Sequence, residues 1–163
     1  MKTILLAILL TGFISLSCQE TNTQVEATDE TEISTNGYDS LLAQKLGADD
    51  YGMKSYVFAM LKSGPNRSQD STEAAQIQAG HMANINRLAE EGKLVMAGPF
   101  LDGGEYRGIF IFDVATLEEA EELIKTDPAV QSGRLVMELH KWYASAAIVE
   151  LNELHNKIQK VSF

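Results

Sequence analysis

The sequence has one cysteine, Cys18, among its 163 residues. A single thiol cannot form a disulfide within the chain, so the fold must hold without one. No apolar run reaches the roughly 18 residues that a membrane-spanning helix needs. Residues 53–163 also lack a basic surface pattern, since fifteen acidic residues outnumber eleven basic ones there. A nucleic-acid partner is therefore not expected, because such proteins carry an excess of clustered lysine and arginine.

Cys18 follows a short apolar leader. Lys2 precedes an apolar run from Ile4 to Leu16, which as a helix would span only about 20 Å and is typical of a signal peptide. Residues 14–18, Ile-Ser-Leu-Ser-Cys, resemble the lipobox of bacterial lipoproteins, in which the cysteine is diacylated and becomes the new N-terminus. We expect a signal peptide at residues 1–17 and a lipid on Cys18 that anchors the protein in the cell envelope. A plain secretory signal with an incidental cysteine is the alternative.

Residues 18–52 are strongly acidic. Eight acidic residues and one basic residue, Lys45, lie between residues 19 and 52. Such a polar, self-repelling stretch is typical of a flexible tether. Near its end, Leu41, Leu42 and Leu46 are spaced so that residues 40–46 could form a short helix.

The folded domain is expected at residues 53–143. Short β-branched and aromatic runs predict strands at residues 54–62, 93–98, 106–114 and 135–143. Apolar residues at helical spacing predict a helix of about 20 residues after Ser71 and a second helix capped by Thr116. The resulting βαββαβ order is that of an α+β, ferredoxin-like fold with an antiparallel sheet. Residues 144–163 are expected to add a C-terminal helix with Leu151, Leu154 and Ile158 on one side.

Three polar residues could carry chemistry. His81 lies on the apolar stripe of the first long helix, Asp102 lies in a loop, and Asp127 precedes a proline. Burial disfavours the charged form of a histidine and a nearby aspartate favours it, so such a pair can transfer protons near neutral pH. Each residue also has a structural interpretation: a hydrogen-bonded core histidine, and two aspartates that shape turns.

A series of short motifs connects these residues. His81 is followed by Gly-Lys-Leu-Val-Met-Ala-Gly-Pro-Phe at residues 92–100, then by an aspartate with glycines, Asp127-Pro128, Gly133 and Lys141-Trp142. In this order the motifs resemble a YCII-related domain. The resemblance implies a dimeric α/β barrel of ferredoxin-like protomers and an active site centred on a histidine and an aspartate. Some relatives are linked to removal of chloride from chlorinated aromatic diols, and some dimeric α/β barrels bind haem through a helix histidine.

Further residues could line a ligand pocket beside His81. Tyr56 and Trp142 offer aromatic surface, and Gly98 and Pro99 could shape the backbone beside the pocket, although core packing is the favoured interpretation of the two aromatic residues. No cluster with the spacing of zinc or iron–sulfur ligands occurs, and no glycine-rich phosphate loop carries the required lysine and hydroxyl. We therefore expect no metal and no cofactor.

Two functions of different classes fit these observations. The first is a small-molecule enzyme of lyase or hydrolase type, in which His81 moves a proton with help from Asp127 or Asp102. The second is a non-catalytic envelope module that binds a small ligand or docks a protein. Both would operate as a homodimer, because two helices cover only one face of a four-stranded sheet and the apolar residues on its other face need a partner.

Overall fold

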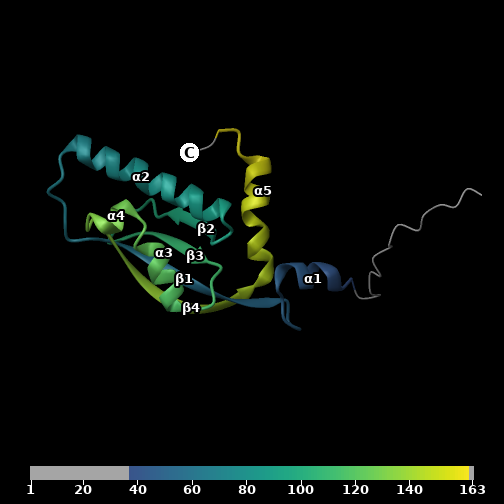
Figure 1. Cartoon of the computed structure of the whole chain (residues 1–163). Coiled ribbons are helices and arrows are strands. Elements are labelled where there is room, and N and C mark those ends of the chain that lie inside the picture. Colours follow the sequence, from purple (N-terminus) through teal and green to yellow (C-terminus); the bar gives the residue numbers. More distant parts are fainter. Residues whose placement is uncertain (1–36, 162–163) are drawn as a thin grey trace, which may run out of the picture. The chain divides into compact units, whose positions relative to one another are not determined.

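The structure is a computed structural model that describes residues 37–161. Its elements follow the order in Figure 1. They are α1 (Ser40–Leu46), β1 (Met53–Ser63), α2 (Ser71–Glu90), β2 (Leu94–Pro99), β3 (Tyr106–Phe112), α3 (Leu117–Ile124), α4 (Pro128–Gln131), β4 (Leu135–Ser145), the 3₁₀ helix η1 (Ala146–Glu150) and α5 (Leu151–Ile158). The order from β1 to β4 confirms the predicted ferredoxin-like βαββαβ fold of the α+β class, with α4 as a short addition.

The four strands form one antiparallel sheet in the order β2-β3-β1-β4. All eleven residues of β1 pair with β4 along one side, and residues 57–62 also pair with β3 along the other. β2 and β3 form the antiparallel pair that the sequence predicts, with an irregularity between Leu94 and Met96. Because side chains alternate along a strand, each strand contributes to both faces of this sheet.

The helix-covered face holds the main core. Alternate residues of β1 point to this side and meet α2 and α3, whose buried side chains complete the cluster. The cluster consists of Val57, Ala59, Leu61, Leu88, Leu94, Phe110, Phe112, Val114, Ala120 and Ile124. The helices are thus held on the sheet by burial of apolar surface, which stabilises by about 25 cal/mol per Å² removed from water.

The opposite side of the sheet, called here the open face, has a smaller core at one end. Tyr56, Val95, Ile111 and Ala144 form a buried cluster there, and residues of η1 pack against it. Further along, other apolar side chains of this face are half-buried in the described chain, among them Phe58, Met60, Met96 and Ile109, and Val136 and Trp142 are exposed.

The caps of the helices explain where α2 and α3 begin. Asp70, and not the expected Ser71, caps α2: its carboxylate accepts hydrogen bonds from the backbone N–H groups of Thr72 and Glu73, both at 2.9 Å. Asp70 has the extended backbone that a capping residue needs, whereas Ser71 is already helical. Thr116 caps α3 as predicted.

Residues 37–52, within the expected tether at residues 18–52, contain the short helix that the spacing of the leucines predicts. Residues 40–46 form α1, in which Leu46 is buried and Lys45 makes a 3.0 Å ion pair with Glu150 of η1. The Tyr143 hydroxyl also bonds to the Asp49 carboxylate. These contacts attach the last part of the expected tether to the domain. The expected signal peptide (residues 1–17), Cys18 and the rest of the tether up to residue 36 lie outside the described residues.

The C-terminal region adds η1 and α5 after β4, which extends two residues beyond its predicted end. The side-chain amide of Asn152 donates a 2.8 Å hydrogen bond to the backbone oxygen of Leu94 and so joins α5 to β2. The expected apolar side of this helix is largely uncovered, because Leu154 and Ile158 are 54% and 80% exposed. Within residues 37–161, no helix is long and apolar enough to cross a membrane.

Candidate active site

His81 lies in the middle of α2 on the side that faces the sheet. Its predicted neighbours on the stripe, Ile85 and Leu88, take part in the main core. The imidazole ring stacks on the ring of Phe110 from β3, with 5.9 Å between the ring centroids and 17° between the planes. Only 11% of the His81 side chain is exposed. The histidine is therefore held between a helix and the sheet, with a small part of its side chain open to solvent.

The structure brings His81 together with Asp127. The Nδ1 atom of His81 lies 2.7 Å from Oδ2 of Asp127, and the Asp127 residue is fully buried. Asp127 is also the N-cap of α4, and its Oδ1 accepts a 2.8 Å hydrogen bond from the backbone N–H of Ala129. The sequence Asp127-Pro128 fits this role, because proline is favoured in the first turn of a helix. One carboxylate thus serves both as a helix cap and as the partner of the histidine.

Gly80 allows this close approach. A Cβ atom added at Gly80 would lie 2.9 Å from Cγ of Pro128, closer than side chains normally come. Only glycine therefore lets α2 and α4 approach closely enough at this point. The role of Gly80 was not predicted from the sequence, although a glycine inside a helix costs about 1 kcal/mol relative to alanine and so points to a packing requirement.

The geometry of the pair determines which nitrogen of His81 is available. An ionised carboxylate only accepts hydrogen bonds, so the Nδ1 atom that faces Asp127 carries the hydrogen. The Nε2 atom then has the free lone pair, and within residues 37–161 it has no hydrogen-bond partner. A histidine held in this tautomer can accept a proton at Nε2, while the aspartate stabilises the positive charge that forms.

Asp102 is not part of this arrangement. It is exposed in the loop after β2, and its carboxylate accepts a 3.2 Å hydrogen bond from the backbone N–H of Gly104. This contact is the turn-forming role that the sequence left open for it. Among the described residues, the side-chain partner of His81 is Asp127.

The aromatic residues expected beside His81 lie on the open face instead. Tyr56 and Trp142 are cross-strand partners, their ring centroids 6.1 Å apart. Tyr56 is buried in the smaller core, whereas His81 and Phe110 belong to the helix-covered side. The expectation of a shared pocket is corrected for this pair, because alternation along β1 directs Tyr56 away from α2.

Tyr56 is held as a neutral phenol. Its hydroxyl bonds to the backbone oxygens of Ser145 and Ala146 at 3.1 and 3.3 Å. Burial raises the pKa of Tyr56 to about 12, and the negative charge of Asp113 contributes to the same shift. A phenol of this kind is a structural hydrogen-bond donor at neutral pH.

Gly98 and Pro99 lie at the end of β2. Gly98 pairs with Ile109 on the open face, and Pro99 is exposed and pairs with Gly108. No heavy atom lies within 4 Å of a Cβ added at Gly98. Gly98 therefore belongs to the face opposite His81, and no close contact with residues 37–161 requires its lack of a side chain.

A cavity of about 350 Å³ lies elsewhere, between α3 and β4. Its lining residues are Leu117, Glu121, Ile124, Lys125, Met137 and Leu139. Neither His81 nor Asp127 lines it. A haem does not fit against His81 in this arrangement, because the ring is stacked on Phe110 and nearly buried. No group of three or more histidine, cysteine, aspartate or glutamate side chains between residues 37 and 161 could hold a metal ion.

Comparison with known proteins identifies the family. The model of the YCII-related domain matches residues 56–142, which is more than half of the chain. The chain belongs to the YCII-related domain family. The uncharacterized protein YjpA of Bacillus subtilis (strain 168) is 38% identical over 64 residues, which cover 39% of this chain and 73% of YjpA.

Two solved structures resemble this YCII-related protein in fold. Muconolactone isomerase aligns with a TM-score of 0.45 and 17% identity, over 53% of this chain and 86% of its own. The 5-chloro-2-hydroxyhydroquinone dehydrochlorinase of Burkholderia phenoliruptrix AC1100, in complex with 2,5-dihydroxybenzoquinone, aligns with a TM-score of 0.39 and 18% identity, over 53% and 92% of the two chains. These identities are too low to transfer a substrate or a reaction.

Proposed function

We propose that this YCII-related protein is a small-molecule enzyme of lyase or hydrolase type in which His81 transfers a proton. The observation that carries the proposal is the 2.7 Å contact between His81 and the fully buried Asp127. Asp127 fixes the tautomer and the orientation of the imidazole, so Nε2 is the reacting atom.

In a lyase reaction, Nε2 of His81 takes a proton from an acidic C–H group of the bound substrate, the electron pair left on carbon forms a double bond and expels the leaving group, and the imidazolium passes its proton to that leaving group or to water. In a hydrolase reaction, Nε2 takes the proton from a water molecule, whose oxygen attacks the substrate and displaces the leaving group, which receives the proton from the imidazolium. Such a step contributes about 10²–10⁴-fold to a rate. No hydroxyl group within residues 37–161 is hydrogen-bonded to His81, and the single cysteine lies outside them, which favours proton transfer over covalent catalysis.

A hydrogen–deuterium exchange assay tests this function across several classes of candidate substrate at once. The protein is incubated in D₂O with a panel of small phenols, keto acids and carboxylates, and deuterium uptake into each compound is measured by mass spectrometry. We expect at least one compound to exchange with the wild type, and His81→Ala to slow that exchange by about 10²–10⁴-fold. Circular dichroism verifies that the variant is folded. Equal exchange by both proteins for every compound would remove the catalytic proposal and favour a ligand-binding or docking module.

The proposed site of action is the cell envelope, with the protein anchored through a lipid on Cys18. Support comes from the apolar leader and from the single cysteine that follows it. Two acyl chains hold a protein stably on a membrane, whereas one does so only weakly. Expressed in bacteria with an alkyne-labelled fatty acid, the wild type should carry the label in the membrane fraction and Cys18→Ala should not. Label on Cys18→Ala would exclude this anchor.

We also propose that the protein is a homodimer that pairs two open faces. The apolar side chains of this face, among them Phe58, Met60 and Trp142, are half-buried or exposed within one chain, and Trp142 is 37% exposed. Contiguous apolar surface of this kind is typical of protein interfaces. Sedimentation of the chain without residues 1–18 should give twice the mass of one chain. A monomer at every concentration would contradict the proposal.

A further inference from the structure

A second polar connection joins α2 to the segment that carries Asp127. Asn84 lies one helical turn after His81 and is buried, with 7% of the residue exposed. Its Oδ1 atom accepts a hydrogen bond from Arg87 Nη2 at 2.8 Å, and it shares the single hydroxyl hydrogen of Thr126 with the backbone oxygen of Leu123, at oxygen–oxygen distances of 2.9 and 2.6 Å. Thr126 immediately precedes Asp127, so this connection reaches the backbone next to the aspartate.

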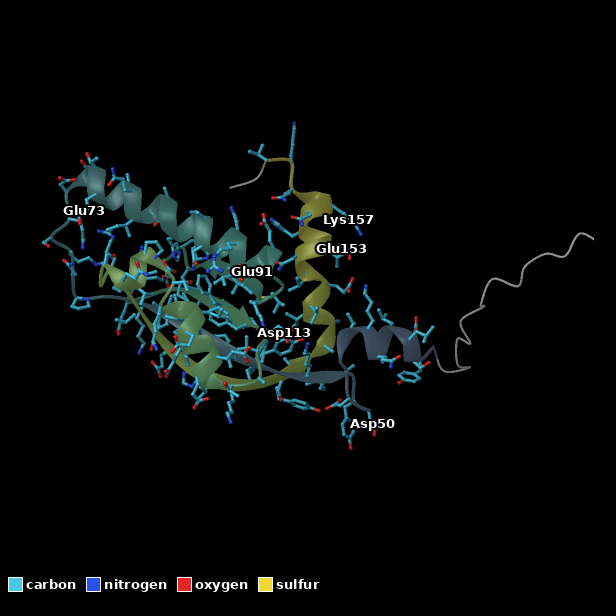
Figure 2. All side chains as sticks on the ribbon, viewed as in Figure 1. Asp50, Glu73, Glu91, Asp113, Glu153 and Lys157 are labelled. Atoms are coloured by element: carbon cyan, nitrogen blue, oxygen red, sulfur yellow. The ribbon has the colours of Figure 1, made fainter. Side chains whose placement is uncertain are left out.

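Arg87 closes the connection on the solvent side. Its Nη2 atom lies 2.9 Å from the Thr126 hydroxyl oxygen, and its Nη1 atom donates to Glu91 at 2.8 Å. Figure 2 shows Glu91 at the end of α2 opposite to Glu73. The guanidinium group is thus held at both of its terminal nitrogens, and Thr126 is held although the residue itself is exposed.

Three contacts therefore run in register between α2 and residues 126–128. Gly80 approaches Pro128, His81 bonds to Asp127, and Asn84 bonds to Thr126. The contact at Gly80 fixes the chain after Asp127, and the contact at Asn84 fixes the chain before it. A hydrogen bond at 2.7 Å is lost if its acceptor moves by about 1 Å, so the position of this short segment decides whether the carboxylate meets Nδ1.

We propose that Asn84, Arg87 and Thr126 are positioning residues that hold the Asp127 carboxylate against Nδ1 of His81. The effect of these residues on catalysis rests on the proposed function. Their effect on the tautomer of His81 does not, because the tautomer can be measured on the imidazole without a substrate. With the connection intact, His81 keeps its hydrogen on Nδ1 and its lone pair on Nε2. Without the hydrogen bonds that connect Asn84 and Arg87 to Thr126, Asp127 retains its bond to Ala129 and the imidazole of His81 samples both tautomers.

The ¹⁵N chemical shifts of the His81 ring test the positioning, because they report which nitrogen carries the hydrogen. The spectra are recorded on the intact chain in detergent. Thr126→Val removes the hydroxyl and keeps the shape, and Thr126→Ser keeps the hydroxyl. We expect at least a fivefold rise in the minor tautomer in Thr126→Val and in Asn84→Ala, and wild-type shifts in Thr126→Ser. Thr72→Val, at the start of α2, is the matched control and should also give wild-type shifts.

The outcomes separate this inference from the proposed function. Wild-type His81 shifts in both Thr126→Val and Asn84→Ala would overturn the positioning role and leave a network that only stabilises the fold. A tautomer change in both variants supports positioning, whether or not His81→Ala affects any reaction. In the exchange assay, Thr126→Val should lower the maximal rate about tenfold and leave the KM of the exchanging compound unchanged. A rise in KM alone would contradict the proposed mechanism of action.

Discussion

On the helix-covered face, the side chains of His81 and Asp127 are only 11% and 1% exposed, and their contact is supported by glycine packing and a helix cap. On the open face, Glu138 is about half exposed and contacts Lys62 at 2.5 Å and His140 at 3.3 Å. The hydrogen bond from Lys62, with a smaller contribution from His140, holds the pKa of Glu138 below its usual range. The contact between His81 and Asp127 is complete within one chain. Glu138 and its partners instead lie on a surface that we expect a second copy of the chain to cover.

The comparison of the two faces separates the stability of one chain, which depends on the helix-covered face, from association of two chains, which depends on the open face. A buried charged contact is costly to break, because removal of one partner leaves the other without its hydrogen bond in a dry environment. An exposed ion pair contributes about 0–1 kcal/mol. Substitutions on the helix-covered face should therefore affect the folded state of one chain, and substitutions on the open face should affect association.

The largest effect is expected for Asp127→Ala. The substitution removes the acceptor of His81 Nδ1 and the N-cap of α4, and should lower the free energy of unfolding by about 3 kcal/mol, as measured by urea denaturation. Asp102→Ala is the matched control, since its carboxylate is exposed and its hydrogen bond among the described residues is to Gly104. The control should lose no more than about 0.5 kcal/mol. Equal losses would show that the contact to His81 contributes nothing.

Met60→Lys should separate association from folding. Met60 is half-buried on the open face, so a lysine there keeps its charge in water in one chain but loses that hydration in a dimer, where the neighbouring Glu138 already pairs with Lys62. We expect the dissociation constant of the dimer to rise by at least about 100-fold in sedimentation equilibrium. Leu101→Lys introduces the same charge in an exposed loop and should leave association unchanged. A dimer of unchanged affinity in Met60→Lys would place the interface elsewhere.

Gly80→Ala tests the close approach of α2 and α4. The added methyl group meets Pro128 at 2.9 Å, and the overpacking should outweigh the better helix propensity of alanine for a net loss of about 1–2 kcal/mol. Gly98→Ala is the control on the open face, where no atom lies within 4 Å of the new Cβ. It should be neutral or slightly stabilising in thermal unfolding. A stabilised Gly80→Ala would show that Pro128 adapts without cost.

The last effect is absent at neutral pH and is expected only at high pH, where Tyr56 titrates. The pKa of Tyr56 is raised to about 12, whereas the phenol of an unfolded chain titrates near 10, so the folded state loses stability as the pH rises from about 10 to 12. Tyr56→Phe should remove most of this loss in unfolding curves recorded across that range. The hydrogen bond to Asp49 raises the pKa of the exposed Tyr143, and Tyr143→Phe should change the curve less. A larger change in Tyr143→Phe than in Tyr56→Phe would show that the loss of stability at high pH comes from the exposed Tyr143.

The order of elements could be read from the sequence because hydrophobic period and caps are local properties. The choice between Asp102 and Asp127 could not, since it depends on an approach of residues 46 positions apart that Gly80 and Pro128 control. The sequence does not indicate which face of β1 is covered by α2, and so Tyr56 and Trp142 were expected beside His81.

The attachment of α1 to η1 has a mechanical consequence. A force applied to the chain before residue 37 reaches the domain first through α1, where the Lys45–Glu150 ion pair and buried Leu46 resist it. If α1 detaches, the load passes to the start of β1, which pairs with β4 from Met53 onward and with β3 from Val57 onward. Pulling along a central strand shears many hydrogen bonds at once, so α1 would yield while the sheet that supports His81 and Asp127 stays intact.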